Sequence, residues 1–316
     1  MRLSRRHVLA AAAAMAALPA GLRAQAPLQV VATTGMIADA ARQIGGAAVE
    51  VRGLMGPGVD PHSYRQTRTD IVAMANAGLV LWHGLYLEAQ MEEFLLDLGR
   101  DRAVVPVAEA LPEDRLIGHD DYAGRYDPHV WMDPELWAVV AAAVRDALIT
   151  VSPESEETFR AAAETHLAEI GALATYARET LATVPEGARV LVTAHDAFNY
   201  FGRAYGFEVV GIQGISTESE AGLRRVADLV DLLVERRIGA VFVESSVSDR
   251  NIRALIEGAA AQGHEVAVGG ELYSDAMGEP GTYEGTYLGM IDHNVTAIAR
   301  TLGGAPPEGG FRGAEH

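Results

Sequence analysis

A long segment with helical periodicity divides this chain into two halves, and it constrains the fold more than any other feature. The segment starts at Ser152-Pro153 and runs to about Thr183, with Ser at a favoured capping position and Pro at the first helical position. At ~1.5 Å per residue, such a helix is ~45 Å long, about the span of two small lobes. We therefore predict a connector between two domains. The alternative is an ordinary last helix of the first domain, followed by a loop.

On both sides of this segment, short apolar runs alternate with helical periods, for example a predicted helix over residues 87–98. The apolar runs cover residues 28–32, 49–54, 79–82 and 103–107 before the connector, and residues 189–193, 207–211, 240–243 and 265–268 after it. This alternation predicts βα units with parallel strands. We expect an α/β fold of two similar α/β lobes with mainly parallel four-stranded sheets, joined by one long connecting helix. Ligands would bind in the cleft between the lobes, at the carboxyl ends of the strands. The predicted domains are residues 27–151, the connector 152–184, and residues 185–316.

Residues 1–26 have the composition of an export signal. Ser4-Arg5-Arg6-His7-Val8-Leu9 precedes an apolar run too short to span a membrane, and Ala24-Gln25-Ala26 is a small-x-small cleavage sequence. The paired Arg resembles the twin-arginine signal, although Val stands where Phe is usual, so general secretion is the alternative. Because the chain has no cysteine, we expect no lipid anchor. The predicted location is the periplasm, or the outside of the cell, as a soluble protein.

Charge and cysteine content narrow the possible partners. The formal net charge of −18 disfavours nucleic acid and anionic lipid as partners and favours cations, although it also serves solubility. The absence of cysteine excludes disulfides and thiolate metal sites. A transition-metal site in this chain must therefore use imidazole and carboxylate ligands. We expect a monomer.

Four side chains are candidate metal ligands. His62 and His129 each follow an Asp-Pro pair, whose restricted backbone would pre-position the imidazole. His195 follows an apolar run and is predicted to open a helix, whereas Asp275 follows another apolar run. The competing interpretation is a turn or capping residue at each position, most strongly at Asp275.

Six of the other seven histidines, all except the C-terminal His316, are interpreted as ordinary structural or surface residues. They are His7, His83, His119, His166, His264 and His293. His119 is the nearest to an exception, because Asp120 and Asp121 follow it and the three could capture metal on a loop. An exposed loop histidine is the preferred interpretation of His119.

Several motifs together resemble one known family. They are Gly58-Val59-Asp60-Pro61-His62-Ser63-Tyr64, Asp127-Pro128-His129-Val130-Trp131-Met132-Asp133-Pro134, Thr193-Ala194-His195-Asp196-Ala197-Phe198, Glu244-Ser245-Ser246-Val247-Ser248 and Leu272-Tyr273-Ser274-Asp275-Ala276-Met277-Gly278. They are similar to the signatures of the zinc/manganese solute-binding proteins of ABC importers, the TroA-like or ZnuA-like family. The resemblance implies two α/β lobes joined by one long helix, a metal in the cleft, and an ABC transporter permease as partner. It carries the ligand positions to His62, His129, His195 and Asp275.

The ligand set favours Zn²⁺ as the bound ion. Three imidazoles and one carboxylate suit four-coordinate Zn²⁺, and nitrogen-rich sites bind Zn²⁺ more tightly than Mn²⁺. Family members that prefer manganese typically have Glu where His195 stands. The alternative is Mn²⁺, or mixed Mn²⁺ and Fe²⁺. It is supported by the short segment Leu111–Tyr126, where many zinc-binding members have a long His- and acid-rich loop.

The sequence disfavours two other classes of protein, a secreted zinc hydrolase and an adhesin. A secreted zinc hydrolase would keep an open metal position for water, whereas four protein ligands fill the site, and the chain has no Gly-x-Ser-x-Gly nucleophile. Glu244 is then a structural carboxylate rather than a general base. An adhesin would need an anchor. We therefore expect a binding protein and no enzyme.

The continuous connector also predicts limited motion. A helix without a break offers no hinge, so closure of the lobes should be small. Ion release would proceed by loosening of the loops that carry His129, His195 and Asp275. The lobes are expected to share little besides the connector and the metal.

Overall fold

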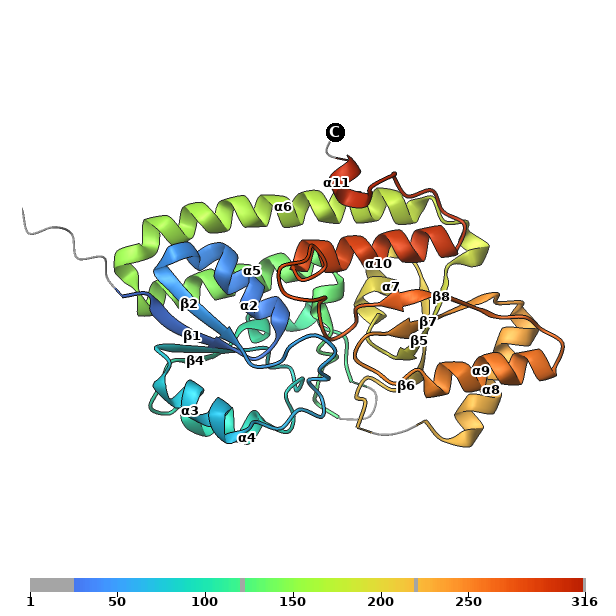
Figure 1. Ribbon diagram of the computed structural model, residues 1–316, viewed down its shortest axis with the longest axis horizontal. Coiled ribbons are helices and arrows are strands. Elements are labelled where there is room, and N and C mark those ends of the chain that lie inside the picture. Colours follow the sequence, from blue (N-terminus) through green and yellow to red (C-terminus); the bar gives the residue numbers. More distant parts are fainter. Residues whose placement is uncertain (1–25, 120–122, 219–220, 315–316) are drawn as a thin grey trace, which may run out of the picture.

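A computed structural model describes residues 26–119, 123–218 and 221–314 and has two α/β lobes (Figure 1). Apart from Ala26, the predicted export signal lies outside the described residues, as do Asp120 and Asp121. The main elements of the first lobe are β1 (Leu28–Ala32), α2 (Gly35–Gly45), β2 (Val49–Gly53), α3 (Arg68–Asn76), β3 (Leu79–Trp82), α4 (Glu92–Leu98), β4 (Val104–Pro106) and α5 (Pro134–Val151). Those of the second are β5 (Val190–His195), α7 (Asn199–Tyr205), β6 (Glu208–Gln213), α8 (Leu223–Arg236), β7 (Ala240–Glu244), α9 (Arg250–Ala261), β8 (Ala267–Leu272), α10 (Tyr287–Thr301) and α11 (Gly310–Ala314).

The first lobe contains the predicted parallel four-stranded sheet. Its strand order is β2-β1-β3-β4, and every pairing is parallel. All four residues of β3 are buried, as expected for a parallel strand covered on both faces. Because the strands run the same way, their carboxyl ends lie at one edge of the sheet, where the loops that reach the cleft begin.

In the second lobe the strands are also parallel, but they form two ladders rather than one four-stranded sheet. β5 pairs with β6, and β7 pairs with β8. β5 and β7 lie next to each other but are not paired as strands of one sheet. At the end of β5, the backbone N–H of His195 donates to the side-chain carboxylate of Glu244 in β7, at 2.9 Å. A side chain therefore satisfies a backbone donor at the end of β5 that a continuous sheet would pair with a carbonyl.

The long helix α6 (Glu156–Ala182) lies along both lobes and packs against α2 and α5 of the first and α10 of the second (Figure 1). It starts later than predicted, because Pro153–Ser155 forms a 3-10 turn. The Ser152 hydroxyl donates to the Glu154 side chain at 2.7 Å and does not cap the helix. Across the described chain, α6 included, we find no helix with the length and apolar character required to cross a bilayer.

A single hydrophobic core continues from one lobe into the other. It contains buried residues of β1, α2, α5 and α6 together with residues of α7 and α10. Polar bonds also cross the boundary: the Trp131 indole N–H donates to the Ser274 carbonyl at 2.8 Å, and the Tyr287 hydroxyl donates to the Trp131 carbonyl at 2.9 Å. The expectation that the lobes share little besides the connector and the metal is therefore wrong.

A turn replaces the first part of the helix predicted over residues 87–98. Residues 85–91 form turns, and Leu85 and Tyr86, just before the predicted helix, have the non-helical φ values of 53° and 70°. The buried Glu88 carboxylate stabilises this turn by accepting the backbone N–H groups of His83 and Gly84 at 2.8 and 3.2 Å. Regular helix therefore begins only at Glu92.

Candidate metal centre

The structure brings the four predicted ligands together between the lobes. His62 lies in the loop after β2, His129 lies just before α5, His195 is the last residue of β5, and Asp275 follows β8. One ligand atom from each lies within 4.8 Å of the others, and all four residues are buried. His195 thus ends a strand, and the prediction that it opens a helix is wrong, because α7 starts only at Asn199.

Three spacings between the candidate ligand atoms match those of a small four-coordinate cation, and all four atoms lie within 4.8 Å of one another. Nε2 of His62 lies 3.2 Å from Nε2 of His129, and the Asp275 carboxylate lies 3.4 Å from His129 Nε2 and 3.3 Å from His195 Nε2. A tetrahedral ion with bonds of ~2.0–2.1 Å requires ligand atoms ~3.3–3.4 Å apart. Within the described residues, His195 Nε2 and Asp275 Oδ1 are buried without a hydrogen-bond partner, although such partners are the rule in protein interiors.

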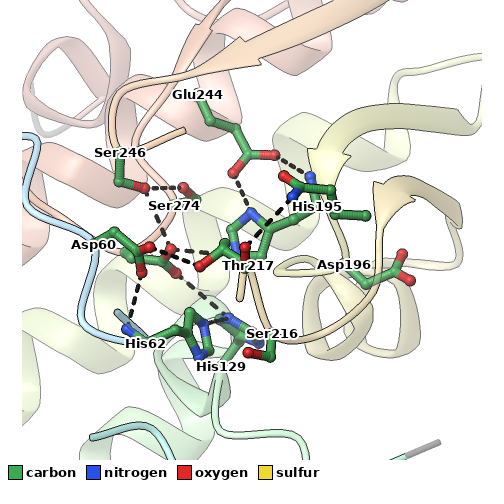
Figure 2. A network of polar contacts seen from close by, with 12 residues as sticks. Asp60, His62, His129, His195, Asp196, Ser216, Thr217, Glu244, Ser246 and Ser274 are labelled. Atoms are coloured by element: carbon green, nitrogen blue, oxygen red, sulfur yellow. Dashed lines mark hydrogen bonds and ion pairs between the residues drawn. The ribbon is translucent and has the colours of Figure 1, made fainter. Parts of the chain in front are cut away.

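A carboxylate contacts the outer nitrogen of each of the rings of His129 and His195, and Figure 2 shows the one at His195, Glu244. Asp127 Oδ1 lies 2.7 Å from His129 Nδ1, and Glu244 Oε2 lies 2.5 Å from His195 Nδ1. A carboxylate at Nδ1 keeps the proton on that nitrogen and leaves Nε2 as the ligand atom. Glu244 therefore contacts the ring of a predicted ligand rather than an open metal position, which agrees with its interpretation as a structural carboxylate.

The buried charges shift the pKa values of these groups in opposite directions. Burial alone lowers the pKa of His129, but the Asp127 and Asp275 carboxylates outweigh it and raise this pKa to about 9. Burial also opposes the charged form of His195, and Glu244 and Asp275 nevertheless raise its pKa well above the usual value. Burial lowers the pKa of His62 to about 3. The metal-free site therefore holds two charged imidazoles beside carboxylates.

The two Asp-Pro-His sequences form the same local turn but use their carboxylates differently. In each, one Asp oxygen accepts the backbone N–H of the His two residues later, at 2.9 Å in both Asp60-Pro61-His62 and Asp127-Pro128-His129. The same oxygen of Asp127 also reaches the His129 ring. Asp60 instead directs its other oxygen to hydroxyl groups, those of Ser63 at 2.8 Å and Thr217 at 2.6 Å. The repeated Asp is the sequence signal for both roles, which go beyond restriction of the backbone.

Two histidines interpreted as ordinary from the sequence have specific positions. His83 is fully buried, and its Nε2–H donates to the Pro128 carbonyl at 2.7 Å, so it supports the loop that carries His129. No local pattern around His83 indicates this role. His119 is only 8% exposed, so its interpretation as an exposed loop residue is wrong. Its backbone N–H pairs with the Arg125 carbonyl and turns it inward.

A groove of about 640 Å³ lies beside the cluster and is lined by residues of both lobes. Met55, Pro57 and Val59 contribute from the first lobe, and Asp275 and Met277 contribute from the second. None of the three histidine ligands lines it. Asp275 is thus the member of the cluster that faces the groove between the lobes.

Comparison with known proteins identifies relatives along almost the whole described chain. The profile of the family described as zinc-uptake complex component A, periplasmic, matches residues 30–301. The manganese-binding lipoprotein MntA of Bacillus subtilis (strain 168) is 48% identical over 283 residues, covering 90% of this chain and 92% of that protein. The zinc-binding protein TroA of Treponema pallidum (strain Nichols) is 44% identical over 273 residues, covering 86% of this chain and 88% of that protein.

Solved structures show the same architecture. The periplasmic zinc-binding protein TroA from Treponema pallidum superimposes with a TM-score of 0.85 at 43% identity, covering 87% of this chain and 99% of that one. The Fe(III)-bound YtgA from Chlamydia trachomatis superimposes with a TM-score of 0.79 at 28% identity, covering 88% of this chain and 99% of that one. The names of these relatives therefore refer to manganese, zinc and iron.

Proposed function

Because this chain belongs to the family of the periplasmic zinc-uptake component A, we propose that it captures Zn²⁺ outside the cytoplasm and delivers it to an ABC permease. The family consists of metal-binding substrate-binding proteins of ABC importers, which are not enzymes. The ion is the cargo. We propose His62, His129, His195 and Asp275 as its four ligands.

The observation that carries the proposal is the convergence of three Nε2 atoms and one carboxylate in a buried cluster. Such a cluster without an ion leaves His195 Nε2 and Asp275 Oδ1 in the protein interior without a hydrogen-bond partner, which is costly. A divalent cation would replace the ring protons and provide a partner for each ligand atom. Imidazole-rich sites favour Zn²⁺ over Mn²⁺, which prefers oxygen ligands.

Mn²⁺ is the second candidate, because a specific observation favours it. The relative that is 48% identical to this chain is named a manganese-binding lipoprotein, whereas the one at 44% is named a zinc-binding protein. The two identities are too close to decide between ions. The ligand chemistry of the site is therefore the basis on which we choose Zn²⁺.

A competition titration on metal-free protein tests the choice. We expect Zn²⁺ to bind at least tenfold, or ~1.4 kcal/mol, tighter than Mn²⁺. The variant His195→Glu should narrow this ratio, because a second carboxylate favours the harder ion. His293→Gln serves as the control, since the His293 ring bonds to the Glu271 carbonyl outside the cluster. Equal affinities in the unaltered protein would contradict the zinc assignment, and a ratio that widens in His195→Glu would place His195 outside the ligand set.

The location and assembly of the protein are part of the same proposal. We propose export by the twin-arginine-like signal at residues 1–26, and delivery to the permease as a monomer. Several relatives are named lipoproteins, including MntA of Bacillus subtilis. We propose residues 27–151 and 185–316 as the two domains and residues 152–184 as their connector. Fractionation of the producing cells, followed by metal analysis of the exported protein, tests the location and the cargo together.

A further inference from the structure

Among the three histidine ligands, the ring of His62 is anchored least. The outer nitrogens of His129 and His195 each contact a buried carboxylate. In the described part of the chain, no carboxylate lies within ion-pair distance of either ring nitrogen of His62. Its position therefore depends on the backbone of its loop.

The loops that carry the ligands also differ in how they are attached to the opposite lobe. Two side chains of α7 hold the segment before His129: the Tyr200 hydroxyl donates to the Asp127 carbonyl at 2.8 Å, and Asn199 Nδ2 donates to Asp127 Oδ2 at 3.0 Å. Further along the same segment, Trp131 donates to the Ser274 carbonyl at 2.8 Å. The His129 loop is thus held across the boundary at several points.

The His62 loop has a different attachment, centred on Asp60 (Figure 2). Asp60 Oδ1 accepts the His62 backbone N–H at 2.9 Å, so this carboxylate sets the direction of the ligand. Asp60 Oδ2 accepts the hydroxyl of Thr217, in the connection after β6 of the opposite lobe, at 2.6 Å. Gln90 of the first lobe and Glu218 of the second form a neighbouring hydrogen bond.

We propose that the Thr217–Asp60 hydrogen bond is a latch between the lobes that positions His62 and controls the rate at which the bound ion leaves. The proposal rests on the proposed function, because it assumes that His62 binds the ion. Thr217 is a positioning residue, since it acts on His62 only through Asp60. Opening the latch would release the His62 loop while His129, His195 and Asp275 keep their own contacts. Under this proposal, release of the ion begins at the His62 loop. The sequence had predicted that it would begin at the loops that carry His129, His195 and Asp275.

The latch predicts a kinetic effect that is specific to one hydroxyl group. Thr217→Val keeps the shape of the side chain and removes the donor to Asp60. We expect Zn²⁺ to dissociate about tenfold faster from this variant, with little change in the association rate, because the loss of one neutral-to-charged hydrogen bond is of that size. Thr217→Ser keeps the hydroxyl and should restore the dissociation rate.

The experiment is stopped-flow release of Zn²⁺ into excess chelator, combined with hydrogen exchange of the peptide around residues 56–64 in metal-free protein. Thr175→Val is the matched control, because Thr175 lies exposed on α6 and its hydroxyl donates to the Gly171 carbonyl of its own helix. Ser63→Ala is the second comparison, because Ser63 donates to the same Asp60 oxygen from within the same loop. We expect both variants to release Zn²⁺ at the unaltered rate.

The latch is supported if Thr217→Val alone accelerates release and raises exchange in the His62 loop. It is overturned if Thr217→Val leaves both unchanged, or if Ser63→Ala has the same effect, since the tie between the lobes would then not matter. If the unaltered protein fails to bind Zn²⁺, the proposed function fails separately. The exchange comparison on metal-free protein still decides whether Thr217 holds the loop.

Discussion

At the scale of single residues, the protonation of His129 and His195 determines how ion capture depends on pH. Both pKa values are raised, that of His129 to about 9, so both rings carry a proton at pH 7 in the metal-free protein. A bound ion requires neutral imidazole, and binding must therefore release these protons. His62, with its pKa lowered to about 3, is already neutral and contributes none.

We predict the release of about two protons per Zn²⁺ at pH 7, and an affinity that rises with pH up to about 9. Calorimetric titration in buffers of different protonation enthalpy measures the proton number. The stability of the metal-free protein depends on pH in the opposite direction to the affinity and falls as the pH rises. The raised pKa of His129 adds stability that is fully present below about 6.5 and is lost as the pH rises through about 9. An affinity that changes only around pH 6.5, the value of an unperturbed histidine, would contradict the carboxylate pairing.

At the scale of elements, α6 is part of the core that both lobes share. Leu173 in the middle of the helix is fully buried in that core, whereas its neighbour Ala172 is exposed. We predict that Leu173→Ala lowers the free energy of unfolding by about 2–5 kcal/mol and leaves a single cooperative transition. Ala172→Gly should cost only about 1 kcal/mol, through helix propensity.

Urea unfolding followed by circular dichroism, with hydrogen exchange in each lobe, provides the measurement. Two separate transitions in Leu173→Ala would show that the lobes fold independently. That result would favour α6 as a simple connector. One transition at lower urea supports a core that belongs to both lobes.

At the scale of the whole molecule, the shared core limits how far the lobes can separate. Opening the cleft as a clamshell would break the Trp131–Ser274 and Tyr287–Trp131 bonds and expose core residues of α6 and α10. We predict that small-angle scattering gives nearly the same radius of gyration for metal-free and Zn²⁺-loaded protein. Zn²⁺ should still raise the unfolding temperature, because an ion at 100 times its Kd stabilises the folded state by about 2.7 kcal/mol. A large decrease in the radius of gyration on loading would instead show hinged closure.

The sequence by itself determined the features that depend on short stretches of chain. β-branched runs and helical periods indicated the strands and α6. The Asp-Pro-His sequences indicated a restricted backbone at His62 and His129, and in the structure each Asp accepts the N–H of the His two residues later. The motifs around His62, His129, His195 and Asp275 indicated the ligand set through a family resemblance, and the four side chains do come together.

Only the tertiary structure decided the contacts between distant residues. Glu244 contacts a ring 49 residues away, and Asp60 accepts a hydroxyl 157 residues away. The first contact depends on how β5 and β7 pack within the second lobe, and the second depends on how the two lobes pack; local propensity encodes neither. The raised pKa of His129 also depends on tertiary structure, because the distant Asp275 carboxylate joins Asp127 at the ring and the two together outweigh the effect of burial. The continuous core likewise depends on which faces of α6 and α10 meet, and apolar periodicity gives the face of a helix but not its partner.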